Sequence, residues 1–202
     1  MQLQIICRYV PGSIVRVLLK NFVTYDYVEF SPGPYLNMII GPNGTGKSSI
    51  ACALCIGLGW PPSILGRASE LKAFVKNGCE EGFIEIELKG VVGKPNLVIR
   101  RHLNATDNKS IWKLNGQETT QKDVQARVHG LNVQVDNLCT FLPQDKVSSF
   151  AQMTPQQLLK ETQKAAGNPN LTRWHHMLID GGVNLRELDE VCYEQVLNHW
   201  LA

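Results

Sequence analysis

Eight consecutive residues, 41–48, combine three glycines with a lysine and a serine in the pattern G-x-x-x-x-G-K-S. Glycines let the backbone amides of such a loop turn toward an anion, and the start of a following helix adds a favourable dipole. The pattern is that of a P-loop, which binds the phosphates of a nucleoside triphosphate together with Mg²⁺. We expect Lys47 to reach the β- and γ-phosphates and Ser48 to give its hydroxyl to the metal. The residues predicted to line the phosphates are Gly41, Pro42, Asn43, Gly44, Thr45, Gly46, Lys47, Ser48 and Ser49.

The segments on either side of this loop have the character that a P-loop requires. Residues 36–40 form a short apolar run bounded by turn residues, as expected of a buried parallel strand. Residues 49–58 are rich in Ala, Leu and Ile and predict a helix, which Gly57, Gly59 and Pro61 should end. A strand directly before the loop and a helix directly after it distinguish true P-loops from chance matches.

An antiparallel β region is predicted from the remaining apolar segments. Residues 13–20 and 25–30 have the alternation of strands, and residues 83–88 alternate strictly between apolar and charged types. Residues 97–101 can pair with the latter across a loop that contains glycine and proline. An Asn-Gly pair at residues 115–116 is a tight-turn signal that extends the same sheet.

Two later helices have recognisable caps. Thr120 can cap a helix that ends near His129, and Thr154 begins a capping-box pattern with Gln157 in a helix that Gly167 should end. These signals divide the chain into three predicted parts. They are a leader over residues 1–12, an N-terminal lobe over residues 13–167 and a divergent helical tail over residues 168–202.

The composition is that of an ordinary globular chain, with 202 residues, 44% hydrophobic and 19% charged. The net charge of +2 does not by itself indicate a nucleic-acid binder. No run approaches the roughly 18 to 20 apolar residues that span a bilayer, so no membrane association is expected. The six cysteines are interpreted as reduced thiols. Cys52 and Cys55 form a Cys-x-x-Cys, which we interpret as packing residues of the helix rather than as a zinc or redox site.

Several motifs resemble one known family. Asn43 between the P-loop glycines is typical of ABC-type ATPases, and residues 141–145, Phe-Leu-Pro-Gln-Asp, look like the Q-loop of that class. Further segments, including Gly-Pro-x-Leu-Asn-Met-Ile, Leu-Gly-Arg-Ala, Phe-Val-Lys-x-Gly and Gln-Val-x-Asn-Leu-Cys-x-Phe-Leu-Pro-Gln-Asp-Lys-Val, resemble the N-terminal ATPase half-head of the structural maintenance of chromosomes (SMC) family. The resemblance covers residues 13–167 and fits the subunit-five branch of the Smc five-six complex. It implies an α/β fold, a P-loop NTPase of the ABC-ATPase type present as a partial head, with an N-terminal lobe and an antiparallel β subdomain.

The resemblance assigns chemical roles beyond phosphate binding. Gln144 falls on the Q-loop glutamine, which in the family contacts Mg²⁺ and the attacking water. Lys47 and Gln144 are therefore the candidate catalytic residues, and Ser48 and Gln144 are the candidate metal ligands. ATP and Mg²⁺ are the implied cofactors.

The resemblance also places residues outside these loops near the nucleotide. Asn21 and Phe22, with their neighbours Lys20 and Thr24, fall on the family's loop after the first strand. Packing at the end of a strand is the alternative for Asn21 and Phe22. Arg67 falls on the arginine that senses the engaged head or DNA, and a solvated loop cation is the alternative there.

The implied function is that of a eukaryotic nuclear protein, associated with chromosomes, that acts on DNA in repair, recombination and chromosome maintenance. Its implied partners are the C-terminal half-head, a second SMC subunit of the subunit-six type, the non-SMC subunits of the complex, and DNA. A coiled-coil arm would begin in residues 168–202, where the apolar residues do not settle into sustained heptads.

Parts of a working ABC-type site are not found in the sequence. We find no signature loop containing Ser-Gly-Gly and no Walker B strand ending in Asp-Glu, because Gly181 stands where the glutamate should follow Met-Leu-Ile-Asp at residues 177–180. In the family these parts lie near the C-terminus, so we expect only the front half of one head here. We therefore expect nucleotide binding without appreciable hydrolysis unless a C-terminal lobe is supplied. Two alternatives stay open: a small P-loop kinase or GTPase, although no Asn-Lys-x-Asp motif is present, and a non-catalytic truncated module that acts only as a partner.

Overall fold

The computed structural model describes residues 8–65, 70–107 and 109–200. The chain forms two compact units, residues 1–152 and 153–202, which are described separately. The division falls after Gln152, whereas the sequence suggested that the first lobe would extend to Gly167. The helix that we expected to close the first lobe therefore belongs to the second unit.

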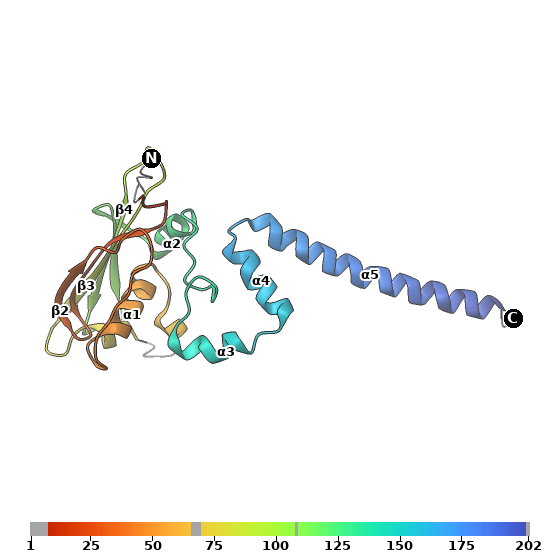
Figure 1. Ribbon diagram of the computed structural model, residues 1–202, viewed down its shortest axis with the longest axis horizontal. Helices are drawn as coiled ribbons and strands as arrows, with labels where there is room; N and C mark the ends of the chain where they lie inside the picture. The colour runs from red at the N-terminus through yellow and green to blue at the C-terminus, as the bar shows by residue number, and fades with distance from the viewer. Residues whose placement is uncertain (1–7, 66–69, 108, 201–202) are drawn as a thin grey trace, which may run out of the picture. The chain divides into compact units, whose positions relative to one another are not determined.

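The first unit is built on one antiparallel sheet of six strands in the order β2-β1-β3-β4-β5-β6 (Figure 1). The strands are β1 (Ile14–Phe22), β2 (Tyr25–Phe30), β3 (Glu81–Leu88), β4 (Leu97–Asn104), β5 (Ser110–Leu114) and β6 (Gln117–Thr119). This sheet confirms the predicted β region, including the turn at residues 115–116. Because side chains alternate along a strand, one face is apolar and buried, with Val17, Leu19, Ile84, Ile86, Ile99 and Leu103 at its centre.

Helix α1 (Lys47–Gly57) packs on the buried face of the sheet. Gly57 permits a close approach, because a Cβ atom there would lie 2.7 Å from Ile84 and 2.6 Å from Ile86. Helix α2 (Gln121–His129) begins as predicted, and its capping residue Thr120 accepts a hydrogen bond from the amide of Asp123 at 3.2 Å. The first unit also contains the short helices η1 (Pro62–Leu65), η2 (Leu71–Phe74), η3 (Gln144–Lys146) and α3 (Val147–Ala151).

The predicted leader makes contacts with the first unit. The hydroxyl of Tyr9 donates to the carbonyl of Pro32 at 2.6 Å. The amide of Gly12 donates to the carbonyl of Lys89 at 2.8 Å. Residues 9–12 are therefore held against the fold, whereas the Pro-Gly pair at residues 11–12 suggested a leader outside it.

The second unit contains helices α4 (Pro155–Ala165) and α5 (Pro169–Trp200). The predicted capping box of α4 is confirmed, because the amide of Gln157 donates to the hydroxyl of Thr154 at 3.3 Å and the amide of Thr154 donates to the side chain of Gln157 at 2.9 Å. Helix α5 has 32 residues and runs without a break through Gly181 and Gly182. The irregular apolar residues of the tail thus lie on one continuous helix.

The predicted strand at residues 36–40 is wrong for this structure, because the segment has no strand assignment. Leu36 is 91% exposed and Ile40 is 83% exposed. A parallel strand is stable when neighbouring strands satisfy its backbone groups and both of its faces are covered. Within the part of the chain that the structure describes, no strand pairs with residues 36–40.

The Cys-x-x-Cys pair lies inside the core, as the packing interpretation predicted. Cys52 and Cys55 are both buried on α1. Burial is the main cause that raises the pKa of the Cys55 thiol to about 12, which leaves it in the unreactive thiol form. Among the described residues there is no group of His, Cys, Asp and Glu that could hold a metal ion. None of the described helices is both long and apolar enough to cross a membrane.

Candidate nucleotide-binding site

The P-loop forms the turn before α1, and two of its glycines have backbone angles that other residues rarely adopt. Gly44 has φ +85° and Gly46, the N-cap of α1, has φ +95°. Lys47 and Ser48 are the first two residues of the helix, so their amides belong to the helix end that lacks intrahelical acceptors. Such an end, with its partial positive charge, is a favourable place for a phosphate.

The side chain of Lys47 folds back over the loop. Its Nζ atom donates to the carbonyls of Gly41 and Pro42, both at 2.6 Å. The hydroxyl of Thr45 also donates to the carbonyl of Pro42, at 2.8 Å. The loop thus holds a positive charge beside the start of α1, where the sequence placed the β- and γ-phosphates.

The turn between β1 and β2 packs directly against the P-loop. A Cβ atom on Gly46 would lie 2.7 Å from the hydroxyl oxygen of Thr24 and 2.7 Å from that of Tyr25. Thr24 was expected near the nucleotide from the resemblance. Sequence reasoning missed Tyr25, and the only signal for it was its place beside Thr24.

Asn21 and Phe22 occupy positions that fit the packing alternative. The side-chain amide of Asn21 donates to the carbonyl of Glu81 at 3.0 Å. Phe22 has no exposed area and stacks on Phe74 with ring centroids 6.0 Å apart. The ring of Phe22 therefore has no surface with which to contact a nucleotide in this structure.

Ser48 and Gln144 line the same cavity, which has a volume of about 150 Å³ and is also lined by Phe141 and Asp145. The fold thus brings the two predicted metal ligands to one place. Hydroxyl and amide oxygens are hard donors that suit Mg²⁺, which usually keeps phosphate oxygens and waters among its ligands. The residues present therefore fit a metal that arrives with a nucleotide. Asp145 adds a carboxylate that sequence reasoning missed, although it directly follows Gln144.

The remaining predicted site residue is Arg67. It lies outside the described residues, so its expected role stays a prediction.

Comparison with known proteins decides the family. The profile of the AAA domain matches residues 16–172. Structural maintenance of chromosomes protein 5 of Arabidopsis thaliana is 44% identical over 181 residues, which are 90% of this chain and 17% of that protein. The protein of the same name from Schizosaccharomyces pombe is 48% identical over 180 residues, which are 89% of this chain and 16% of that protein. The chain belongs to the SMC family.

A solved SMC structure shows the same fold. The Smc head domain with an extended coiled coil from Pyrococcus furiosus, bound to the C-terminal domain of ScpA, matches with a TM-score of 0.66 at 22% identity. The match covers 90% of this chain and 49% of that chain. The expected fold class is thus confirmed, and the chain corresponds to the N-terminal part of an SMC ATPase head. Membership of the SMC family sets aside the alternative of a small kinase or GTPase. The chain spans only 16% to 17% of the length of the Arabidopsis thaliana and Schizosaccharomyces pombe relatives.

Proposed function

We propose that the chain is the ATP- and Mg²⁺-binding N-terminal half of an SMC-type ATPase head that acts in a DNA-associated complex for chromosome maintenance and repair. The observation that carries the proposal is the cavity that Ser48 and Gln144 line together. These residues are the oxygen donors that this lobe would give to a nucleotide-bound Mg²⁺. Membership of the SMC family supports ATP as the nucleotide.

Nucleotide binding would replace contacts that the loop now makes with itself. Lys47 donates to two neutral carbonyls, and charged phosphate oxygens are stronger acceptors for an ammonium group. The ammonium would therefore turn from Gly41 and Pro42 to the β- and γ-phosphates. Gln144 would orient the attacking water, and bound Mg²⁺ would offset the charge that develops on the phosphoryl group.

Hydrolysis requires groups that the described site does not supply, and we assign them to the C-terminal half-head. An apolar cavity of about 750 Å³ lies between residues 31–40 and the adjoining elements β1, β2 and α1. The apolar side chains that line it from those three elements are Ile14, Val17, Val28, Phe30, Ile50 and Leu54. A lobe that adds a strand beside residues 36–40 would cover both this cavity and the exposed segment.

The other proposed partners follow from the family. They are a second SMC subunit of the subunit-six type, the non-SMC subunits of the complex, and DNA, with the assembly in the nucleus on chromosomes. The Pyrococcus furiosus head bound to ScpA supports a non-SMC partner. Helix α5 would begin the coiled-coil arm, since Leu171, Trp174, Leu178, Leu185 and Leu188 are exposed at spacings of three, four or seven residues.

The proposal is tested by nucleotide binding to the purified chain. Calorimetric titration with ATPγS and Mg²⁺ should give saturable binding to the wild type and an affinity at least about 30-fold lower for Lys47→Ala, because a charge-assisted contact is lost. Lys94→Ala removes the same charge from an exposed position far along the chain and serves as the matched control. Circular dichroism should show that both variants are folded. An unchanged affinity in Lys47→Ala, or a preference for guanine nucleotides, would contradict the proposal.

A further inference from the structure

Arg101 on β4 is a positive charge inside the core, with only 4% of its surface exposed. Its Nη1 atom donates to the carbonyl of Ile56 at 2.8 Å, and its Nε atom donates to the hydroxyl of Ser110 at 3.1 Å. The guanidinium also lies 4.3 Å from the ring centroid of Trp112. Among the residues with described positions, no carboxylate forms an ion pair with it.

A buried charge without an ion-pair partner is costly unless other groups compensate for it. Here the compensation comes from the end of a helix, because Ile56 is the penultimate residue of α1 and the C-terminal carbonyls of a helix carry partial negative charge. The face of Trp112 adds a cation–π contact. Burial lowers the pKa of Arg101 to about 10, so the group stays protonated at neutral pH.

The helix that Arg101 holds is the one that carries the P-loop lysine and serine. Lys47 and Ser48 lie in its first turn, and Gly57 at its other end sits against Ile84 and Ile86. At about 1.5 Å per residue a helix of this length is a rigid rod of roughly 16 Å. Holding the C-terminal end of α1 on the sheet therefore determines the position of its N-terminal end.

We propose that Arg101 is a positioning residue for the nucleotide site, which holds the C-terminal end of α1 on the sheet and so sets the place of the phosphate-binding end. The inference rests on the proposed function, since the readout that matters is nucleotide binding. The hydrogen bonds and the aromatic contact of Arg101 given above reach Ile56, Ser110 and Trp112, none of which belongs to the P-loop or lines the cavity of Ser48 and Gln144. A purely stabilising role would change the fraction of folded protein and leave the affinity of the folded protein unchanged.

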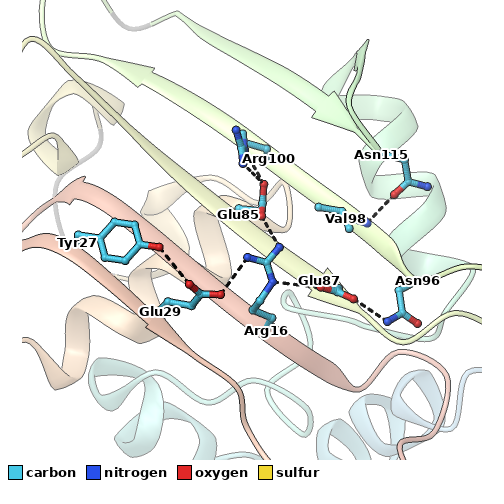
Figure 2. Close-up of polar contacts among 9 residues, drawn as sticks. All are labelled: Arg16, Tyr27, Glu29, Glu85, Glu87, Asn96, Val98, Arg100 and Asn115. Atoms are coloured by element: carbon cyan, nitrogen blue, oxygen red, sulfur yellow. Dashed lines mark hydrogen bonds and ion pairs between the residues drawn. The ribbon is translucent and has the colours of Figure 1, made fainter.

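Arg100, the next residue on the same strand, provides a matched control on the opposite face of the sheet. Its Nη2 and Nε atoms both lie 2.5 Å from Oε2 of Glu85 (Figure 2). Its guanidinium lies 4.7 Å from the ring centroid of Phe83. Each arginine thus makes polar contacts and an aromatic contact, but only Arg101 reaches α1. Arg100→Met removes a charge and an aromatic contact from the face opposite α1, together with an ion pair to Glu85, whereas Arg101→Met removes a charge and an aromatic contact from the face that meets α1.

The experiment compares Arg101→Met, Arg101→Lys and Arg100→Met in the whole chain. The first readout is the affinity of each variant for ATPγS with Mg²⁺, measured under conditions in which that variant is folded. The second is amide hydrogen exchange at residues 46–50 without nucleotide. We expect Arg101→Met to bind the nucleotide about 10-fold more weakly and to exchange its amides faster, because small displacements of a binding group reduce its effectiveness steeply. The affinity should fall about 3-fold in Arg101→Lys and less than about 2-fold in Arg100→Met.

Equal effects of Arg101→Met and Arg100→Met, or no effect of either, would overturn the inference. If Arg101→Met does not fold, Arg101→Lys decides, and wild-type affinity together with wild-type exchange in that variant would overturn it. If the wild-type chain binds no nucleotide, the proposed function fails and the exchange readout alone decides. Faster exchange confined to the Arg101 variants would then support the inference, and unchanged exchange would refute it.

Discussion

Two glycines of the P-loop share a backbone conformation and differ in their surroundings. Both Gly44 and Gly46 have positive φ angles, +85° and +95°. Apart from its chain neighbours, no described residue has an atom within 4 Å of a Cβ placed on Gly44, whereas a Cβ on Gly46 would meet the hydroxyls of Thr24 and Tyr25 at 2.7 Å. At the first position only the backbone requires glycine, and at the second the packing requires it as well.

Alanine substitution separates these two requirements. Gly44→Ala should cost about 1 kcal/mol through its φ angle alone, and Gly46→Ala should cost about 3 kcal/mol because a close contact is added. Urea unfolding measures both free energies of unfolding. The double variant Tyr25→Ala with Gly46→Ala should recover part of the larger cost. Equal losses in the free energy of unfolding for the two single variants would show that the turn between β1 and β2 can move to admit the added methyl group at no energetic cost.

At the scale of elements, a charged network ties four strands together on the face of the sheet opposite α1 (Figure 2). Arg16 on β1 contacts Glu29 on β2 at 3.3 Å, and on β3 it contacts Glu85 at 2.6 Å and Glu87 at 3.2 Å. Glu85 is buried and also pairs with Arg100 on β4. These cross-strand pairs offset the cost of burying Glu85, since both of its oxygens have cationic partners.

The network gives the first unit a defined pH dependence through Glu87. A hydrogen bond from Asn96 at 2.7 Å is the largest cause that lowers the pKa of Glu87 from its ordinary 4.5, with Arg16 adding to it against burial. Because the folded pKa is lower, the stabilisation from this group is complete above pH 4.5 and is lost as the pH falls through the folded value.

Asn96→Ala tests this dependence. It should lower the free energy of unfolding by about 1 kcal/mol at pH 7, and the difference from wild type should shrink as the pH falls below 4.5 and Glu87 takes up a proton. Urea unfolding at pH 7, 5 and 3.5 measures the trend. In a Glu87→Gln background the effect of Asn96→Ala should no longer vary with pH. A difference that stays constant from pH 7 to 3.5 in the natural background would exclude Glu87 as its source.

At the scale of the whole molecule, the first unit leaves an apolar surface uncovered. Leu36, Met38, Ile39 and Ile40 are exposed beside the apolar cavity of about 750 Å³. Exposed apolar patches of this kind mark interaction surfaces or sites of self-association. This surface is the one on which we propose that the C-terminal lobe of the head packs.

Turnover should depend on that lobe. We expect negligible phosphate release from the purified chain with ATP and Mg²⁺, and measurable release when the C-terminal lobe of an SMC head of the same type is added in trans, because the added lobe supplies the missing base and signature groups. A coupled phosphate assay measures both rates. Lys47→Ala should abolish the release in the mixture, which controls for a contaminating ATPase. Steady hydrolysis by the chain alone would show that its own residues suffice.

Local patterns in the sequence determined most of the secondary structure of the first unit and the family of this protein. The P-loop, the alternating strands and the caps at Thr120 and Thr154 were predictable because each depends on residues a few positions apart. The family was predictable for the same reason, since motifs carry it, and the roles of Lys47 and Ser48 stay predictions that rest on the same motif. The conformation of residues 36–40 could not be predicted from their own sequence, because a buried parallel strand depends on neighbouring strands that lie elsewhere in the chain.

Only the tertiary structure decided which distant residues meet. The shared cavity of Ser48 and Gln144 and the contact of Tyr25 with Gly46 join segments that no local pattern connects. From the sequence, Arg101 had no role beyond its place in a predicted strand over residues 97–101. The alternation of β4 then turned it toward the end of α1 and left Arg100 facing Glu85. Side-chain periodicity determines which residues share a face of the sheet. The packing of α1 on one of those faces determines which of these residues contact the helix.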